Sequence, residues 1–251
     1  MEKVNDEYML LHYHLKDFTI KETEDWLALN KPSGFLSIPD REGKEVSLKS
    51  LLKDKYGNIF TVHRIDKDTS GLILFAKNET AHKHLTKQFE ERKTKKIYCG
   101  LVIGSPGEKN GTITQPIAEH PALNGTMMVH RKGKEAITDY EVLNDFGIYT
   151  FVQFQIHTGR THQIRVHMKD MGHPIVCDPL YGDGKPILVS SLKKKFNLSK
   201  NEESEKPILG RLALHSHQLS FLEQDGKMIT LEAALPKDMS ATLQQLSKWK
   251  K

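Results

Sequence analysis

The sequence predicts an α+β fold in a single domain. Strand-like and helix-like segments are mixed along the chain without regular strand–helix–strand repetition. No internal repeat or long linker divides the 251 residues, and a chain of this length buries about 70–75% of its unfolded surface without disulfide staples. We therefore expect one domain over residues 1–251, with its core at about residues 20–240.

The first half of the chain predicts strands followed by two helices. Residues 8–30 alternate weakly between polar and apolar side chains, which favours strands. Ser47 is the expected N-cap of a helix that ends at Gly57. Thr80 is the expected cap of a second helix, because the apolar residues after it recur every four positions.

The second half predicts two strands, two helices and a surface insertion. Residues 96–103 and 152–156 are strand-like, and the second segment alternates strictly. Thr161 is expected to begin a helix, and residues 240–249 form the last one. Residues 189–210 are rich in Lys, Glu and Ser, which indicates a long surface insertion.

Composition indicates a soluble globular protein with a weak preference for polyanions. The hydrophobic fraction is 37%, the charged fraction 27% and the net charge +5. No stretch approaches the roughly 20 apolar residues of a membrane span, and the first residues lack the order of a secretory signal. Two cysteines, Cys99 and Cys177, are too few for a disulfide scaffold. We expect a reduced, cytoplasmic monomer.

Residues 63–71 carry the strongest functional signal. Asp66 follows the fixed cation Arg64 and precedes turn-forming residues, after which an apolar run occupies 72–76. On its own, such an aspartate is more often a turn residue or a cap. A carboxylate held on a turn before a buried strand is nevertheless fixed in place, so it can act as a nucleophile or a base.

This segment resembles the aspartate motif of the RluA-type pseudouridine synthases, which isomerise uridine in RNA. The resemblance implies their fold, a large mixed and mainly antiparallel sheet flanked by helices and loops around a central cleft. The family's frequent N-terminal S4 RNA-binding module is expected to be absent, since only about 20 residues precede the first match. Further matches follow in the family's order at residues 31–34 (KPSG), 96–98 (KIY), 133–138 (GKEAIT), 158–167 (TGRTHQIRVH), 172–174 (GHP), 178–182 (DPLYG) and 212–215 (LALH).

The resemblance implies roles for five residues. Asp66 matches the family's catalytic aspartate, and Arg165 matches the arginine that pairs with it. Tyr98 matches the tyrosine placed to stack on uracil, and Ile164 matches an apolar residue of the same pocket. Arg64 is similar to the arginine that fills the space left by the flipped base. The reaction is an isomerisation without redox change, so we expect neither a cofactor nor a metal.

The resemblance also implies an RNA partner, ribosomal or transfer RNA. A uridine inside a helix is out of reach, so the enzyme must flip it. The insertion at 189–210 is expected to contact RNA through Lys193, Lys194 and Lys195. A basic run, which taken alone is equally well explained as a solvated face, is expected to hold phosphates. The run consists of Lys83, Lys87, Arg92, Lys93, Lys95 and Lys96.

Two rival functions stay open. The first is a non-catalytic RNA-binding or RNA-remodelling protein on the same fold, which the presence of Asp66, Tyr98 and Arg165 disfavours. The second is a metal-dependent hydrolase that uses the histidines of 157–173, although no His-Glu-x-x-His occurs. Position 177 is cysteine where the family commonly has glycine, which leaves open a reactive thiol there.

Overall fold

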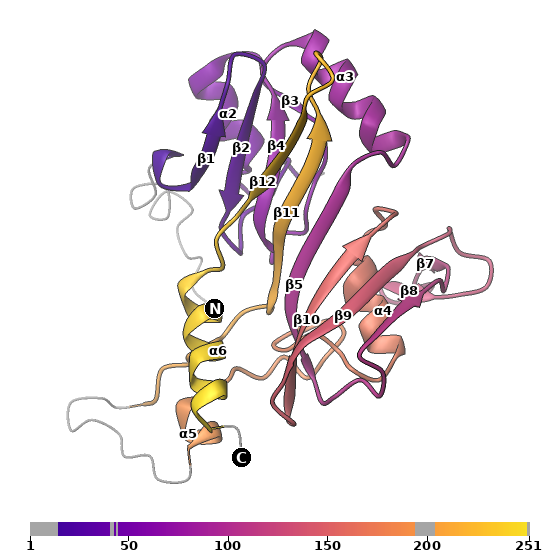
Figure 1. Cartoon of the computed structure of the whole chain (residues 1–251), viewed down its shortest axis with the longest axis vertical. Coiled ribbons are helices and arrows are strands. Elements are labelled where there is room, and N and C mark those ends of the chain that lie inside the picture. Colours follow the sequence, from indigo (N-terminus) through magenta and orange to yellow (C-terminus); the bar gives the residue numbers. More distant parts are fainter. Residues whose placement is uncertain (1–14, 41–42, 44, 194–203, 250–251) are drawn as a thin grey trace. The chain divides into compact units, whose positions relative to one another are not determined.

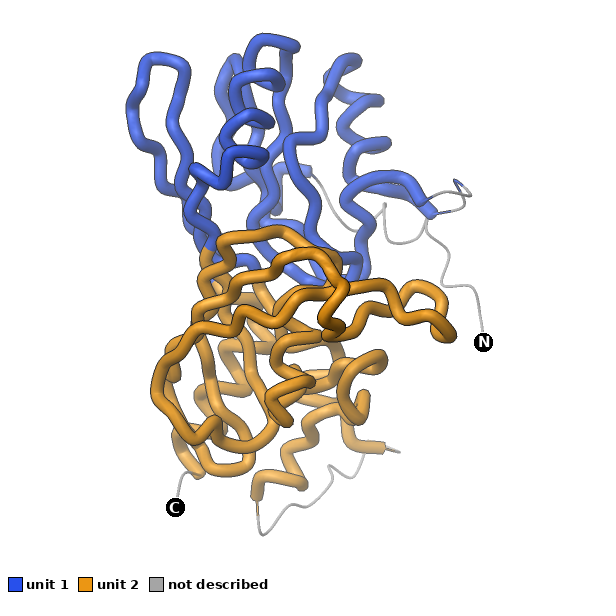
Figure 2. Tube along the Cα trace, turned by 90° about the vertical axis from the view of Figure 1, so that its right-hand side faces the viewer, with its two compact units in different colours: residues 1–96, 216–234 blue, residues 97–215, 235–251 orange. Residues whose placement is uncertain are grey.

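The computed structural model describes residues 15–40, 43, 45–193 and 204–249 (Figure 1). Contacts divide the chain into two compact units, which are described separately (Figure 2). Unit 1 comprises residues 1–96 and 216–234, and unit 2 comprises residues 97–215 and 235–251. Both units mix strands and helices, which confirms the α+β class. A single domain with a central cleft stays a prediction.

Unit 1 is built on a sheet with the strand order β1-β2-β4-β11-β12, and β3 also pairs with β4. The pairs β1–β2, β2–β4, β3–β4 and β11–β12 are antiparallel. The first two residues of β11 are assigned to unit 2. The elements are a 3-10 helix η1 (Leu15–Phe18), β1 (Thr19–Glu22), β2 (Trp26–Lys31), α2 (Leu48–Tyr56), β3 (Phe60–Thr61), β4 (Ser70–Ala76), α3 (Glu79–Glu90), β11 (Leu214–Leu222) and β12 (Met228–Glu232).

Helices cover both faces of the unit 1 sheet. Successive side chains of a strand point to opposite faces. The odd-numbered apolar residues of β2 and β4 share a core with Leu48 and Leu52 of α2. The even-numbered ones share a second core with Ala81 and Leu85 of α3. Because β4 is buried on both sides, its sequence is a continuous apolar run and not an alternation.

Unit 2 contains a sheet with the order β5-β10-β9-β6 and a separate hairpin of β7 and β8. All of these pairs are antiparallel. Helix α4 packs against β8 and β9, and α5 packs against α6. The first two residues of β5 are assigned to unit 1. The elements are β5 (Lys95–Ile103), β6 (Asn110–Ile113), β7 (Ile117–Glu119), β8 (Met127–Val129), β9 (Thr138–Asp145), β10 (Tyr149–Ile156), α4 (Gln163–Asp170), α5 (Val189–Leu192) and α6 (Lys237–Trp249).

The ends of the helices agree only partly with the sequence prediction. Ser47 caps α2 by accepting the Ser50 N–H, and Gly57 ends the helix with a φ of 70°, as expected. The predicted N-cap of α3, Thr80, is wrong, because Asn78 is the cap and accepts the Ala81 N–H at 2.8 Å. Asparagine and threonine are both common N-cap residues, so residue preference alone did not decide between positions 78 and 80.

The later elements also begin away from their predicted positions. Helix α4 begins at Gln163 after a left-handed His162, two residues beyond Thr161, and α6 begins at Lys237. Of the predicted insertion, α5 is present, whereas residues 194–203, with Lys194 and Lys195, lie outside the described part of the chain. Across the described residues, no helix combines the length and apolarity that a bilayer crossing requires.

Candidate active site

Asp66 lies on the loop that leads into β4 of unit 1. Asp66 itself is half-buried and Lys67 is exposed, but Ile65 before them and Thr69 and Ser70 after them are buried, with exposures of 6%, 2% and 2%. The Thr69 N–H donates to the Asp66 carbonyl at 3.2 Å and closes a turn. The carboxylate therefore stands on a short segment that is anchored at both ends.

A buried lysine donates hydrogen bonds to the backbone of this loop. The Lys31 side chain is fully buried, and its ammonium donates to the Lys67 carbonyl at 2.7 Å. It also donates to the carbonyls of Pro32 and Phe35 at 2.9 and 2.8 Å. A buried ammonium is tolerated only when its donors are satisfied, so these carbonyls fix the position of Lys31 and Lys31 fixes the loop.

Two serines add backbone contacts on either side of Asp66. The Ser37 hydroxyl donates to the Ile65 carbonyl at 2.7 Å, and the Ser33 hydroxyl donates to the Asp68 carbonyl at 2.6 Å. Lys31, Ser33 and Ser37 together hold three backbone carbonyls of the Asp66 loop. The Lys-Pro-Ser-Gly element thus has a structural role, since it anchors the Asp66 loop.

The exit of the loop into β4 requires glycine. Gly71 has a φ of 112°, and a Cβ there would lie 2.2 Å from the backbone oxygen of Ser216 in β11. The Ser216 hydroxyl donates to the Leu72 carbonyl at 3.1 Å. Any side chain at position 71 would separate these strands, so the glycine that ends the aspartate motif is needed for packing.

His63 and Arg64 precede Asp66 and have opposite environments. His63 Nε2 accepts the Leu74 N–H at 3.0 Å, and its ring stacks on Phe89 with 4.6 Å between the ring centres. Burial, with a smaller contribution from the charge of Lys96, lowers the pKa of His63 to about 3, so the ring is neutral. Arg64 is exposed, as a residue that reaches a ligand requires.

Arg165 of α4 in unit 2 is held by a buried acid. Its Nε and Nη2 donate to the two carboxylate oxygens of Asp178 at 2.7 and 2.8 Å, and the two side chains are 2% and 0% exposed. The backbone N–H groups of Leu180 and Tyr181 also donate to Asp178, at 2.9 and 3.1 Å. This bidentate geometry fixes the plane of the guanidinium.

Tyr181 connects the Arg165 pair to the β7–β8 hairpin. The Arg165 guanidinium lies 5.0 Å from the centre of the Tyr181 ring. The Tyr181 hydroxyl accepts the Met127 N–H at 2.8 Å and lies 2.7 Å from Nδ1 of His162. The motif that contains Asp178 and Tyr181 is matched in the sequence, but the sequence analysis assigns neither residue a role. The signal that could have indicated one is an acid and an aromatic residue three positions apart in a matched motif.

The remaining predicted site residues also lie in unit 2. Tyr98 of β5 stands opposite Phe154 of β10 and is 8% exposed. Ile164, next to Arg165 on α4, is 4% exposed. Tyr98, Ile164 and Arg165 thus belong to unit 2, and Asp66 with Arg64 to unit 1. Their assembly into one site, including the pairing of Arg165 with Asp66, stays a prediction.

The basic run of residues 83–96 is not uniform. Glu91 lies 3.9 Å from Lys87 and 2.7 Å from Lys93, which reduces the free charge of both lysines. Lys96 is half-buried, and burial, together with the charge of Arg92, lowers its pKa. Most of the run is exposed, as phosphate binding requires. The exposed members are Lys83, Lys87, Arg92, Lys93 and Lys95.

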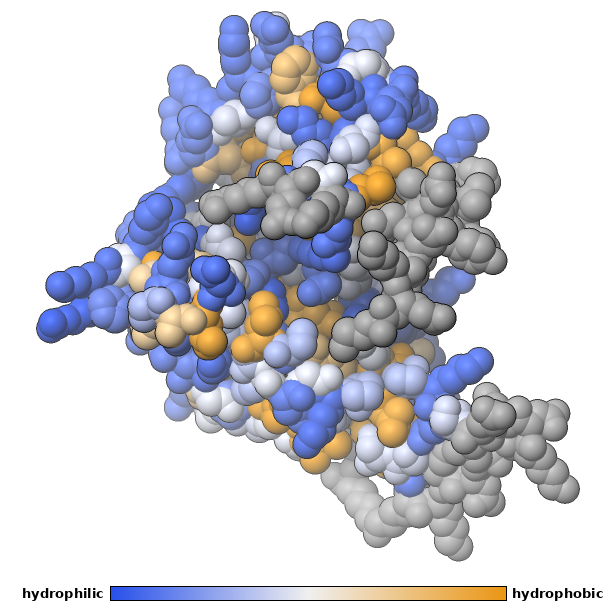
Figure 3. All heavy atoms as spheres, turned by 180° about the vertical axis from the view of Figure 1, so that it is seen from behind, coloured by the Kyte–Doolittle hydropathy of each residue, from blue (hydrophilic) through white to orange (hydrophobic). Residues whose placement is uncertain are grey.

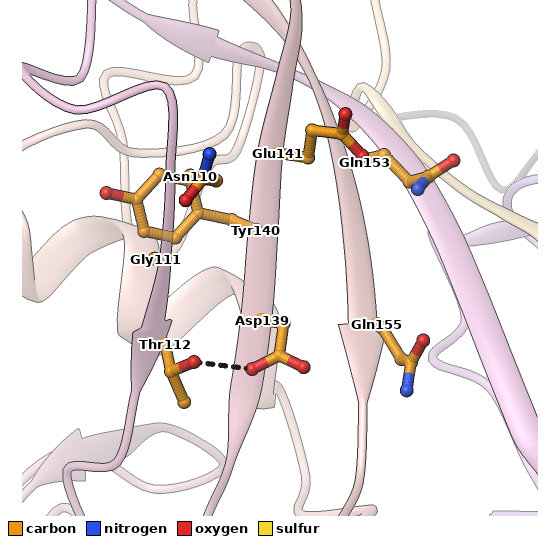
Figure 4. A pocket seen from close by; sticks show the side chains of 8 residues that line it. All are labelled: Asn110, Gly111, Thr112, Asp139, Tyr140, Glu141, Gln153 and Gln155. Atoms are coloured by element: carbon orange, nitrogen blue, oxygen red, sulfur yellow. Dashed lines mark hydrogen bonds between the residues drawn. The ribbon is translucent and has the colours of Figure 1, made fainter.

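A cavity of about 430 Å³ lies over β6, β9 and β10 of unit 2 (Figure 4). It is lined by the carboxylates of Asp139 and Glu141 and by the amides of Gln153 and Gln155. Burial raises the pKa of Asp139, but hydrogen bonds from His157 and Thr112 outweigh it and hold that pKa below its usual range. Two carboxylates make this cavity unsuited to RNA phosphates.

The two thiols are inert. Cys99 and Cys177 are free and buried, and burial raises the pKa of Cys99 to about 12 and that of Cys177 to about 11. Both stay protonated at neutral pH and are poor nucleophiles. Cys177 has a φ of 58°, the left-handed region that favours glycine, which accounts for the glycine common in the family at this position.

The histidines around α4 do not converge. Each has its own hydrogen-bond partner, and within the ranges that the structure describes no three His, Cys, Asp or Glu side chains gather to hold a metal. The metal-hydrolase alternative therefore lacks a ligand set in this part of the chain. The pairs are His157 with Asp139, His162 with Tyr181, His167 with Thr138 and the Gln115 carbonyl, and His173 with the Ile103 carbonyl.

Known proteins share this sequence and fold. The family model described as RNA pseudouridylate synthase matches residues 25–170, which include Asp66, Tyr98 and Arg165. Ribosomal large subunit pseudouridine synthase D of Buchnera aphidicola subsp. Schizaphis graminum is 35% identical over 237 residues, 92% of this chain and 73% of that protein. An uncharacterized RNA pseudouridine synthase of Synechocystis sp. is 34% identical over 228 residues, 86% of this chain and 64% of that protein. The chain thus spans less than two thirds of that relative.

A solved structure shows the fold. Human RNA pseudouridylate synthase domain containing 4 superposes with a TM-score of 0.74 at 23% identity, covering 96% of this chain and 97% of that one. The predicted pseudouridine synthase fold is therefore confirmed. The chain belongs to the RNA pseudouridylate synthase family, and within it to the RluA type, a group of isomerases that act on RNA.

Proposed function

We propose that this protein isomerises uridine to pseudouridine in RNA with Asp66 as the catalytic carboxylate. The backbone contacts of residues 31–37 carry the proposal: Lys31, Ser33 and Ser37 hold three backbone carbonyls of the Asp66 loop. A carboxylate on a loop held in this way suits a reaction that needs one placed against the ribose or the base.

The reaction leaves the composition of the nucleoside unchanged. The N1–C1′ bond breaks, the uracil turns, a C1′–C5 bond forms, C5 loses a proton and N1 gains one. Arg165 would support the Asp66 carboxylate, while Tyr98 and Ile164 would bound the uracil. Exposed Arg64 would occupy the space that the flipped nucleotide leaves. No oxidant, reductant or cofactor is needed for this balance.

The proposed target is a uridine of ribosomal or transfer RNA, modified by a cytoplasmic monomer. Relatives named ribosomal large subunit pseudouridine synthase D, from Buchnera and from Escherichia coli at 31% identity, favour ribosomal RNA. Mapping pseudouridines in total RNA, with and without this protein, would identify the position. Light scattering of the purified protein would give its oligomeric state.

The variant Asp66→Asn tests the proposal. It keeps the size of the side chain and removes the anionic oxygen, so we expect the yield of pseudouridine to fall on the order of 10⁴-fold. Proton release from C5-labelled uridine in RNA measures this, and RNA affinity should be retained. Asp68→Asn is the matched control and should keep most activity. Unchanged turnover in Asp66→Asn would refute the mechanism, and a wild-type protein that binds RNA without turnover would favour the non-catalytic alternative.

A further inference from the structure

A basic groove in unit 2 lies between β7, the segment 132–134 and the loop 159–161. It encloses a cavity of about 460 Å³. Three cationic side chains line it, Lys132, Lys134 and Arg160, which we call the basic ledge. Among the described residues that line the cavity, Glu119 carries the sole carboxylate. The charge balance is thus opposite to that of the cavity in Figure 4.

Backbone contacts fix the ledge. Lys134 and Ile117 of β7 exchange two backbone hydrogen bonds, at 2.8 and 2.9 Å. A Cβ on Gly133 would lie 2.5 Å from the Ile117 backbone, so only glycine allows this approach. The lysines on either side of Gly133 therefore project from a segment that is packed directly against the hairpin.

Arg160 is fixed from the other side of the groove. Its Nε donates to the Glu135 carbonyl at 2.8 Å, and its backbone N–H donates to Oε1 of Gln163 at 3.0 Å. Gln163 is the first residue of α4 and is 3% exposed. The backbone of Arg160 is thereby tied to the start of the helix that carries Ile164 and Arg165, and its guanidinium is tied to the backbone next to Lys134.

The ledge lysines retain their full charge for a ligand. Lys132 and Lys134 are exposed, and no carboxylate within the described ranges lies at ion-pair distance from either. By contrast, Lys87 and Lys93 of the 83–96 run share Glu91. His130 and Arg131, also exposed, precede the ledge. Hydrophilic residues make up much of the surface seen in Figure 3.

We propose that the basic ledge binds phosphates of the RNA backbone. Unpaired cations on a rigid groove recognise a polyanion without reading its bases. The identity of that polyanion as RNA therefore rests on the proposed function. Arg160 offers a planar donor group suited to a phosphate, and the two lysines act as point charges beside it. A strand bound here is held in register with the beginning of α4.

The test is the salt dependence of RNA binding by the full chain. The double variant Lys132→Ala and Lys134→Ala removes two phosphate contacts, so the slope of log K against log[salt] should become shallower by about 1.4–1.8. Fluorescence anisotropy with a labelled RNA stem-loop between low and moderate KCl measures the slope. Lys227→Ala with Lys248→Ala removes the same charge from exposed positions elsewhere and should leave the slope unchanged.

An unaltered slope in the ledge variant, or an equal change in the control, would overturn the proposal. If the double variant melts at a lower temperature, the single variants Lys132→Ala and Lys134→Ala give the slope instead, at about half the change each. Turnover separates this result from the proposed function. If the wild-type protein lacks isomerase activity but the ledge variant has a shallower slope, phosphate binding by the ledge is supported and the proposed function is not. If the wild-type protein is fully active but the slope of the ledge variant is unaltered, phosphate binding by the ledge is refuted and the proposed function stands.

Discussion

Asp66 and Arg165 are both held firmly, but by different kinds of contact. The Asp66 loop is held through its main-chain carbonyls, by Lys31, Ser33 and Ser37. Arg165 is held through its own guanidinium, which binds both oxygens of Asp178. The difference indicates a division of roles: the group proposed to react is positioned indirectly, whereas the group proposed to support it is locked by its side chain.

The strongest test of this comparison is Asp178→Asn. It removes the charge that compensates the buried Arg165 guanidinium, and breaking a buried ion pair from one side costs about 3–5 kcal/mol. We expect a loss of that size in urea unfolding and a lower kcat in the protein that stays folded. Asp225→Asn, at an exposed turn, should change stability by less than about 0.5 kcal/mol. Equal effects of the two variants would show that Arg165 does not depend on Asp178.

Lys31→Met tests the backbone contacts that hold the Asp66 loop. Methionine fills a similar volume but cannot donate, so the carbonyls of Pro32 and Phe35 lose their partner at about 1–3 kcal/mol for each, while the Lys67 carbonyl keeps the Gly34 N–H. We expect a total loss of about 3 kcal/mol in urea unfolding, with a fall in kcat because the Asp66 loop is no longer held. Lys53→Met on the exposed side of α2 is the control. A wild-type kcat in Lys31→Met would show that the Asp66 loop does not depend on the hydrogen bonds of Lys31.

Tyr181→Phe should have the smallest effect. The phenylalanine ring keeps its contact with the Arg165 guanidinium and loses only the hydroxyl that meets the Met127 N–H and His162. We expect a loss of about 1 kcal/mol in thermal unfolding. Tyr56→Phe removes an exposed bond to Glu22 and should cost less. If the two variants cost the same, the link from the hairpin to α4 contributes nothing measurable.

The order of the motifs is sufficient to predict the family, and the mixture of strand-like and helix-like segments predicts the α+β class. The apolar run 72–76 correctly indicates a buried strand. The partners of the charged groups were not predictable. Lysine is almost never fully buried, so the sequence indicated a turn at Lys31 and not an internal ammonium. Asp178 lies 13 positions from Arg165, and no local rule states which acid a buried arginine meets. Contacts of this kind depend on tertiary packing, which periodicity does not encode.

The division of the chain has a consequence for biosynthesis. Strand β4 adjoins β11 in the sheet of unit 1, yet almost the whole of unit 2 is encoded between them. At a translation rate of roughly 5–20 residues per second, β4 leaves the ribosome on the order of 10 s before its neighbour is made. During that interval an apolar strand lacks the partner along one edge, a state that favours aggregation. The nascent protein therefore has a vulnerable period that ends only when its last quarter is translated.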